Sequence, residues 1–456
     1  MKHYKIKRGY DIPLQGRPES RMLAIEEPSV CYLHPARVRG IKARLSVREG
    51  DSVQIGTPVF YDKKEPALQF VSPCAGKISA IQYGPRRVIE SIRIEKNGAA
   101  AVQHARYNLD QIKSMATPDL VDALLRGGMW PLIRQRPFDI IARPRETPLA
   151  VFINCMNTAP LSGDPEFALQ DQADFFAAGV AAMQRLGAKN VHVVVNGNHG
   201  QDSIFARALQ ATDGVTISAF SGNHPAGLVS THIEKLAPIL DLGHLVWYST
   251  AADVVAIGQY LTSGTFPVER VVALSGSALS ETGYIKAPVG CPVQNLIGDR
   301  LRDGENRLIS GDVLTGQTVS LNESIGLYHS GLTVIPEGRA ERFLGWLSPG
   351  FGLPTWSRAY LSAFIPGKTF AQHTNLNGEH RALVKTGDYR KVCSLDILPE
   401  QLIKAILSED IEMMEQLGIL EVAPEDLALC SYICPSKTEF TEIIQAGLDL
   451  MQAELN

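Results

Sequence analysis

The apolar positions between residues 46 and 95 come in short β-branched stretches that are interrupted by turn-forming residues. Gly50-Asp51, Ser72-Pro73 and Gly84-Pro85 mark three of these interruptions. Short strands divided by regular turns are typical of a small barrel or sandwich. The pattern therefore predicts an N-terminal region, residues 1–105, that is built around a barrel-sandwich.

From about residue 149 the pattern changes to apolar runs that alternate with segments of helical period. Asp164 fits the N-cap of the first helix, Pro165 fits its first position and Gly187 would end it. Repeated alternation of strand and helix predicts a Rossmann-like, doubly wound parallel sheet in residues 106–262. We expect strands at residues 150–154, 191–195, 215–220 and 245–248, and helices at 167–186, 203–210 and 233–240.

The rest of the chain returns to strands and then becomes helical. A β-grasp module of the SLBB-like type is predicted at residues 263–330, a connecting segment at 331–395 and a helical bundle at 396–456. Ser436 and Glu439 have the spacing of a capping box for the last helix. We expect strands at 271–274, 283–287 and 312–319, and helices at 293–296, 399–407, 411–418 and after 436, the last with Phe440, Ile443, Ile444, Leu448 and Met451 on one face.

Length and composition fit a multidomain protein of mixed α/β and α+β class. The chain has 456 residues, of which 45% are hydrophobic and 20% charged, enough for about three or four domains. A net charge of −4 gives no excess of basic residues, so nucleic acid is not an expected partner. No apolar run approaches the roughly 18 residues of a membrane span, and residues 1–5 do not resemble a secretory signal. Seven dispersed cysteines favour free thiols in a reducing cytoplasm.

The two ends of the chain differ in charge. Residues 1–45 hold ten Lys and Arg against four Asp and Glu, whereas residues 396–456 hold two Lys against thirteen Asp and Glu. Solvated faces explain this asymmetry more simply than docking surfaces do, and both interpretations stay open.

Two motifs suggest cofactor attachment but are incomplete. The region around Gly50 and Ser72 resembles lipoyl and biotinyl carrier domains, with Lys63 and Lys64 at the hairpin where a carrier has a single lysine. A non-acylated copy of the fold is the favoured interpretation, because fold similarity does not carry function. The loop at residues 196–200 lacks the G-x-G-x-x-G spacing of a dinucleotide site, so a tight turn is expected there. His199 and His224 are as readily loop residues as bases or ligands.

The sequence Cys430-x-x-x-Cys434-Pro435 matches the last two ligands of the ferredoxin-type run C-x2-C-x2-C-x3-C-P. The first two ligands would fall at Pro424 and Leu427, and neither residue can supply a thiolate. We therefore predict that Cys430 and Cys434 are remnants packed in the helical bundle.

Residues 126–138 combine arginine, aromatic and proline residues between the barrel and the sheet. Such a composition is typical of contact surfaces, and an inter-domain linker explains it equally well. Trp130, Arg134 and Phe138 are the candidates for residues near a quinone, which needs an apolar pocket with a few polar groups aimed at its carbonyls.

The order of modules resembles the flavin-carrying subunit of respiratory complex I and the C component of the Rnf complex. Four stretches more specifically resemble the NqrA family, the A components of Na+-translocating NADH:quinone reductases, and the similarity runs nearly from end to end. These stretches are Ile6-Lys7-Arg8-Gly9-Tyr10-Asp11-Ile12-Pro13-Leu14, Asp62-Lys63-Lys64 with Phe70-x-Ser72-Pro73, Arg86-Arg87-Val88-Ile89-x-Ser91, and Phe343-Leu344-Gly345-Trp346.

This resemblance implies a peripheral subunit on the cytoplasmic side of a bacterial inner membrane, in a complex that passes electrons from NADH to ubiquinone and exports Na+. It implies that NADH, flavins, iron–sulfur centres, ubiquinone and Na+ are handled by other subunits, with membrane-embedded ones as partners. The chain itself is expected to bind no cofactor and no metal and to be a non-catalytic subunit that contributes to assembly and to quinone access. The alternative is a stand-alone flavin- or nucleotide-dependent oxidoreductase.

Overall fold

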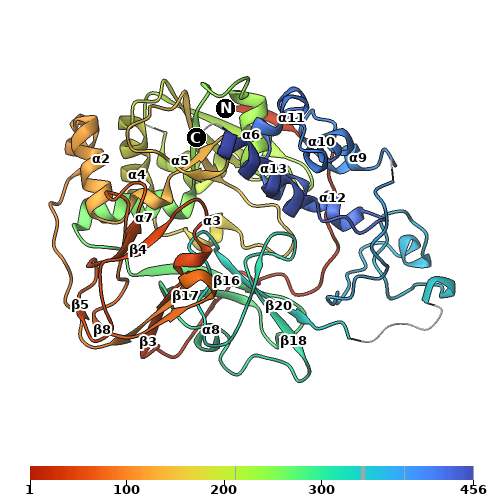
Figure 1. Cartoon of the computed structure of the whole chain (residues 1–456), viewed down its shortest axis with the longest axis horizontal. Coiled ribbons are helices and arrows are strands. Elements are labelled where there is room, and N and C mark those ends of the chain that lie inside the picture. The colour runs from red at the N-terminus through yellow and green to blue at the C-terminus, as the bar shows by residue number, and fades with distance from the viewer. Residues whose placement is uncertain (211, 340–344, 385, 455–456) are drawn as a thin grey trace.

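A computed structural model of the chain describes all residues except 211, 340–344, 385 and 455–456 (Figure 1). Phe343 and Leu344 of the family motif therefore lie outside the described residues. No helix among those described is long and apolar enough to cross a bilayer.

The centre of the molecule is a seven-stranded sheet with helices on both faces. Its strand order is β1-β14-β13-β12-β15-β10-β11, and the first five strands run parallel. Antiparallel β10 and β11 extend the edge beside β15. The strands are β1 (Lys2–Lys5), β10 (Arg134–Arg136), β11 (Ile140–Ile141), β12 (Ala150–Cys155), β13 (Asn190–Asn196), β14 (Val215–Ser221) and β15 (Val246–Thr250).

Side chains of this sheet alternate between two cores because successive strand residues point to opposite faces. Val151 and Ile153 belong to the core that contains α4 (Ala173–Arg185) and α7 (Ala251–Ser263). Phe152 belongs to the core that contains α6 (Val229–Leu236) and the C-terminal helices. At the crossing of α4 and α7 a Cβ on Gly258 would collide with the Phe175 carbonyl oxygen, so the backbones meet closely there.

The barrel-sandwich consists of a four-stranded sheet, β3-β9-β8-β5, and a three-stranded sheet, β4-β6-β7. Fully buried Cys31, Val59, Ile78, Ile92 and Ile94 fill the space between them. The strands are β3 (Val30–Leu33), β4 (Ala43–Leu45), β5 (Ser52–Val53), β6 (Pro58–Asp62), β7 (Gln69–Val71), β8 (Gly76–Tyr83) and β9 (Ile89–Lys96). Helices α1 (Leu109–Ser114) and α2 (Thr117–Arg126) follow the barrel.

The fourth sheet has six strands in the order β19-β18-β20-β16-β17-β2, and α8 (Val293–Ile297) belongs to the same module. Its strands are β2 (Met22–Leu23), β16 (Glu269–Ser275), β17 (Gly283–Pro288), β18 (Asn306–Ser310), β19 (Gln317–Val319) and β20 (Gly331–Pro336). This sheet extends past the boundary predicted at residue 330, because β20 lies between β16 and β18. The N-terminal region is likewise shared, since β1 joins the central sheet and β2 joins this one.

The C-terminal part contains α9 (Tyr389–Val392), α10 (Pro399–Leu407), α11 (Ile411–Gln416), α12 (Ala428–Ile433) and α13 (Phe440–Glu454). These helices pack against α6, on the face of the central sheet opposite α4 and α7. Phe440, Ile444, Leu448 and Met451 of α13 are buried, as the spacing predicts, and Ile443 is partly buried.

Several predicted elements have different bounds. The helix predicted at 167–186 is two helices, α3 (Pro165–Ala168) and α4, separated by a turn in which Gln172 donates to the Leu169 carbonyl. The helix predicted at 233–240 is α6, which ends before Pro238 because proline cannot continue it. Two more helices are shorter than predicted: α5 (Ile204–Ala208), predicted at 203–210, and α11 (Ile411–Gln416), predicted at 411–418.

Two further predictions about local structure are wrong. The strand predicted from Asp312 starts only at Gln317, because the Asp312 carboxylate accepts from the amides of Leu314 and Thr315 and closes a turn. Ser436 does not cap α13. Its hydroxyl donates to the Ala382 carbonyl, and the first amide of α13 donates to Ser431 instead.

Candidate functional site

Strands β10 and β11 form a tight hairpin that carries charged residues to the edge of the central sheet. Its turn residues Phe138 and Asp139 have φ angles of 78° and 52°. This left-handed region is rarely occupied by residues with a Cβ, and least of all by bulky ones. Such conformations persist where surrounding contacts fix them, and the contacts of Asp139 do so here.

Asp139 is the centre of a buried charge cluster. Its carboxylate oxygens lie 2.6 Å from Nη2 of Arg134 and 3.5 Å from Nη1 of Arg136, and one of them accepts a hydrogen bond from the Tyr248 hydroxyl. Burial by itself raises the pKa of Asp139, but the two guanidinium groups outweigh burial and lower the pKa to about 2. Asp139 is therefore ionised at neutral pH.

Arg134 is held between two tyrosine rings. Its guanidinium carbon lies 4.6 Å from the ring centroid of Tyr328 and 5.5 Å from that of Tyr248. The Tyr328 hydroxyl donates to the Pro131 carbonyl at 2.9 Å, which fixes that ring. A cation over an aromatic face in a partly desolvated site contributes about 1–2 kcal/mol, so the orientation of Arg134 is well defined.

Arg136 links the same cluster to the C-terminal helices. Its side chain is 1% exposed, and Nη2 lies 3.0 Å from Oε1 of Glu425. The neighbouring Asp426 is 3% exposed and accepts the Ala423 amide at 2.7 Å. Burial raises the pKa of Asp426 to about 7, above its usual range. Sequence reasoning missed both carboxylates, and the only signal was the acidic excess of residues 396–456.

A cavity of about 880 Å³ opens beside Arg134, where the barrel, the central sheet, the β-grasp sheet and the C-terminal helices meet. Apolar side chains such as Phe70, Met156 and Leu161 share its wall with Arg134 and Tyr328. Cavities of 300–1,000 Å³ with an apolar lining and a few fixed polar groups are typical of sites for small organic ligands.

The β-grasp side of the cavity adds two polar groups that are partly buried, Arg270 and His329. Arg270 donates through Nη1 to the carbonyls of Gly326 and Leu327, at 3.3 and 3.1 Å, and burial lowers its pKa to about 10. Nδ1 of His329 lies 2.7 Å from Oγ of Ser310, and burial lowers the pKa of His329 to about 4. At pH 7 this wall therefore presents the Arg270 cation and the neutral His329 imidazole, and Glu269, Lys286 and Asp312 also belong to the lining.

The three residues predicted near a quinone lie in different surroundings. Arg134 lines the cavity. Trp130 is fully buried, donates to the Ala142 carbonyl at 2.7 Å and packs edge-on against Trp247, with ring centroids 5.6 Å apart. Phe138 is 8% exposed and packs in the core shared with the C-terminal helices. Trp130 and Phe138 thus pack in the cores next to the β10–β11 hairpin.

Cys430 and Cys434 are buried beside Tyr389. Sγ of Cys434 lies 3.0 Å from the Tyr389 hydroxyl, and Sγ of Cys430 lies 3.8 Å from the Tyr389 carbonyl oxygen. Burial raises the pKa of Cys430 well above its ordinary value, so this thiol is protonated. Among the described residues no group of three His, Cys, Asp or Glu side chains is arranged to hold a metal ion.

The remaining candidates occupy a hairpin and two loops. Lys63 and Lys64 are exposed at the turn between β6 and β7, and the buried Asp62 carboxylate accepts the Lys64 amide. His199 is exposed. His224 lines the cavity, with Nδ1 3.2 Å from the Thr158 hydroxyl, and burial lowers its pKa.

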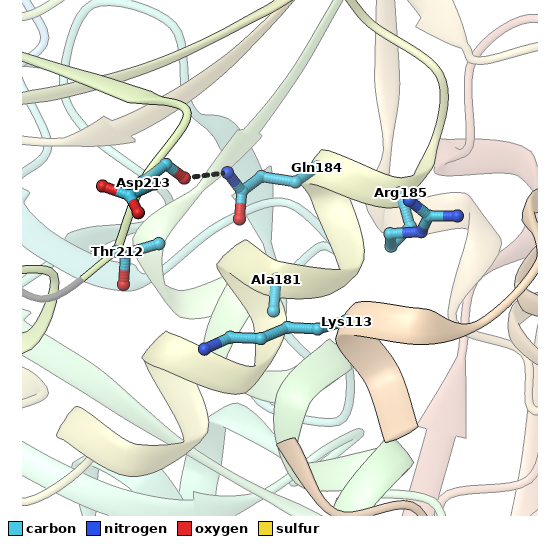
Figure 2. A pocket seen from close by; sticks show the side chains of 6 residues that line it. All are labelled: Lys113, Ala181, Gln184, Arg185, Thr212 and Asp213. Atoms are coloured by element: carbon cyan, nitrogen blue, oxygen red, sulfur yellow. Dashed lines mark hydrogen bonds between the residues drawn. The ribbon is translucent and has the colours of Figure 1, made fainter. Parts of the chain in front are cut away.

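A second, shallower pocket of about 350 Å³ lies between α1, α4 and the segment before β14 (Figure 2). Gln184 donates to the Asp213 carbonyl at 2.8 Å across it. Lys113, Ala181, Arg185 and Thr212 complete the lining. Its lining is mainly polar, whereas the lining of the larger cavity is mainly apolar.

Three family descriptions match consecutive parts of the chain. "NqrA N-terminal barrel-sandwich hybrid domain" matches residues 4–97, "NqrA second alpha/beta domain" matches 115–266, and "NQRA C-terminal domain", an SLBB model, matches 271–320. These matches confirm the predicted barrel-sandwich and the SLBB-like module.

Curated relatives match over nearly the whole length. The chain is 37% identical over 455 residues to the A component of a Na(+)-translocating NADH-quinone reductase from Pseudomonas aeruginosa, with 99% of both chains covered. It is 35% identical to the protein of the same name from Yersinia pseudotuberculosis, again with 99% of both covered. A solved NAD+-reducing nickel–iron hydrogenase aligns at 12% identity over 78% of this chain and 67% of that one, with a TM-score of 0.39, too low to bear on function. The chain therefore belongs to the NqrA family, the A components of Na+-translocating NADH-quinone reductases.

Proposed function

We propose that this chain is a peripheral subunit of a Na+-translocating NADH:ubiquinone reductase on the cytoplasmic side of a bacterial inner membrane. It contributes to assembly with membrane-embedded subunits and to ubiquinone access, while NADH, flavins, iron–sulfur centres and Na+ are handled elsewhere in the complex. The observation that carries this proposal is the end-to-end similarity to the relatives of that name, at 37% identity over 99% of both chains.

The proposal that the chain itself performs no redox step is supported by its ligand positions. Pro424 and Leu427 occupy the places of the first two cluster ligands, and both lie in the short 3-10 turn that precedes α12. The two remaining thiols are engaged with Tyr389. The five parallel strands with helices on both faces support a Rossmann-like ancestry for the central sheet, although the loop after β13 lacks the glycine spacing of a dinucleotide site.

A role in ubiquinone access is supported by the cavity. A quinone head needs an apolar enclosure and donors aimed at its two carbonyl oxygens. Arg134 supplies a donor of fixed orientation, because Asp139 and the rings of Tyr248 and Tyr328 hold it. Arg134 is accordingly the residue that we assign to the quinone side of the cavity.

Purification of the chain from native membranes tests whether it belongs to the complex. We expect co-purification with the other subunits, and no bound flavin absorbance or stoichiometric iron in the isolated chain. Flavin or iron bound to the isolated chain would overturn the proposal that it performs no redox step. Purification without partners would overturn its membership of the complex.

Steady-state kinetics of Arg134→Lys in the assembled complex test the quinone role. Lysine keeps the charge beside Asp139 but loses the planar guanidinium that the tyrosine rings hold. We expect the KM for ubiquinone to rise several-fold, with the KM for NADH unchanged. Arg143→Lys is the matched control, because the Arg143 side chain is 53% exposed and lies outside the cavity lining. Unchanged ubiquinone kinetics in Arg134→Lys would remove Arg134 from this role.

A further inference from the structure

The β-grasp wall of the cavity carries a histidine that is held in a fixed orientation. His329 lines the cavity, and its imidazole lies between two glycines. A Cβ on Gly326 would lie 2.9 Å from Nδ1 of His329, and a Cβ on Gly311 would lie 3.3 Å from its Cδ2. The ring therefore occupies a slot that exists because both flanking positions lack a side chain.

The hydrogen bonds of Ser310 determine which nitrogen of His329 carries the proton. Ser310 is 1% exposed, and its hydroxyl oxygen accepts the Gly326 amide at 2.8 Å. The same oxygen lies 2.7 Å from Nδ1 of His329. A proton on Nδ1 would leave the buried hydroxyl hydrogen without an acceptor among the described residues, so the hydroxyl donates to Nδ1. The hydrogen of the neutral imidazole is therefore on Nε2.

The surroundings of His329 keep its ring uncharged. Burial lowers the pKa of His329, three nearby guanidinium groups lower it further, and Asp312 raises it, with a resulting pKa of about 4. The three guanidinium groups belong to Arg37, Arg134 and Arg270. At pH 7 the imidazole is thus a neutral hydrogen-bond donor that stands among cations.

Nε2 of His329 is the ring nitrogen that is left for a ligand. None of the residues that the structure describes forms a hydrogen bond with it. The Asp312 carboxylate is already engaged, because it accepts the amides of Leu314 and Thr315 at 2.7 and 3.1 Å. The wall therefore offers one N–H group of fixed direction and no charge, which suits a neutral acceptor such as a carbonyl oxygen.

We propose that His329 binds the quinone head group, with its Nε2–H donating to one of the two carbonyl oxygens. This inference rests on the proposed function, which supplies the quinone and the first donor, Arg134. The two oxygens lie on opposite sides of the quinone ring, so they need donors from two directions. Arg134 comes from β10 of the central sheet, and His329 comes from the turn before β20 of the β-grasp sheet. Ser310 is a positioning residue, because it acts through His329.

Steady-state kinetics of the assembled complex with ubiquinone-1 test this assignment. His329→Leu removes the donor, and we expect the KM for ubiquinone-1 to rise about three- to tenfold, the usual cost of one hydrogen bond, with the KM for NADH unchanged. His329→Gln keeps a side-chain N–H, so we expect it to recover most of the loss, which a purely structural role would not produce. His104→Leu is the matched control, because His104 is also half-buried but lies outside the lining, and we expect wild-type kinetics.

The tautomer of His329 is measured independently in the full wild-type chain. Nitrogen-15 spectra of the chain labelled at histidine distinguish a protonated Nε2 from a protonated Nδ1, and the His329 signal is the one that is absent from His329→Gln. We expect the proton on Nε2, and we expect the Nε2 signal to shift when ubiquinone-1 is added. In Ser310→Ala the hydroxyl that fixes the tautomer is gone, so we expect a mixture of both forms.

Each other result has a defined meaning. Unchanged ubiquinone-1 kinetics in His329→Leu overturn the proposal, and so does a proton on Nδ1 in the wild type. A His329→Gln variant as impaired as His329→Leu overturns it too, because the N–H would then not be what the ligand needs. If Arg134→Lys alone raises the KM for ubiquinone-1, only the role of His329 fails. If neither Arg134→Lys nor His329→Leu raises it, the quinone part of the proposed function fails as well.

Discussion

The protonation of Asp426 provides a quantitative test of the contact between the central sheet and the C-terminal helices. Asp426 is 3% exposed, accepts the Ala423 amide and lies near Arg136. Burial raises its pKa from 3.8 to about 7 in the folded chain. The folded state therefore binds a proton more tightly than the unfolded state, so this carboxyl contributes stability below pH 4 and loses that contribution as the pH rises through 7.

The size of this contribution to stability follows from the difference between the pKa of Asp426 in the folded and in the unfolded chain. A pKa raised from 3.8 to about 7 corresponds to about 4 kcal/mol in total. At pH 5.5 about 2 kcal/mol of this contribution remains, and at pH 8 almost none remains. We therefore expect the free energy of local opening around residues 423–433 to fall by about 2 kcal/mol between pH 5.5 and pH 8.

Hydrogen exchange followed by mass spectrometry measures this opening free energy in peptides from α12, once intrinsic exchange rates are divided out. Asp426→Asn keeps an oxygen that can accept the Ala423 amide but cannot titrate, so we expect its opening free energy to be flat over this range. Glu415→Gln, an exposed carboxyl of α11, should retain the wild-type slope. A flat wild-type profile, or a slope that persists in Asp426→Asn, would refute the assignment of the pH dependence to Asp426.

Three other substitutions test the packing. Arg136→Met removes a buried cation from the carboxylates of Asp139 and Glu425, which are 13% and 36% exposed, and should cost about 3 kcal/mol, lowering the thermal midpoint of the whole chain. Gly258→Ala places a Cβ against the Phe175 carbonyl oxygen and should cost about 1–3 kcal/mol despite the better helix propensity of alanine, which calorimetry can measure. Ser431→Ala removes the acceptor of the first α13 amide and should cost about 1 kcal/mol in urea unfolding.

The alternation of apolar runs predicted the central sheet closely. The strands expected at 150–154, 191–195, 215–220 and 245–248 correspond to β12 to β15 within one or two residues, because fully buried parallel strands read as continuous apolar runs. The β1 and β10 strands that extend this sheet were not predicted. Each is short, and the strand that pairs with it comes from a distant part of the sequence, since Lys2 pairs with Ser218 and Arg134 with Tyr248.

Helix α7 shows what local pattern reasoning overlooks. Thr250 and Asp253 interrupt an apolar run from residue 245 onward, and in the structure they form the capping box at the start of α7. The polar residues thus mark a boundary between a buried strand and a buried helix. The apolar run from residue 245 onward is therefore two elements, the strand β15 and the helix α7, and the capping residues show where one ends and the other begins.

The candidate site was only partly predictable, because its residues come from distant parts of the chain. Arg134, Arg136 and Asp139 lie close together in the sequence, yet their partners Tyr248, Tyr328 and Glu425 come from three other parts of the chain. Composition left a contact surface and an inter-domain linker equally open for the 126–138 segment. It could not indicate that Arg134 faces a cavity while Trp130 supports it from within the core.

Asp139 pairs with both Arg134 and Arg136, and this sharing gives the charge cluster a structural role between the central sheet and the C-terminal helices. A buried ion pair adds little net stability, since desolvation of both partners offsets their attraction, but loss of one partner is expensive. Arg134 at the cavity and Arg136 at the C-terminal helices both depend on Asp139. We interpret the cluster as fixing the position of the C-terminal helices relative to the central sheet. If these helices shifted, Arg136 would lose its ion pair with Glu425. Apolar contacts alone would tolerate such a shift far better.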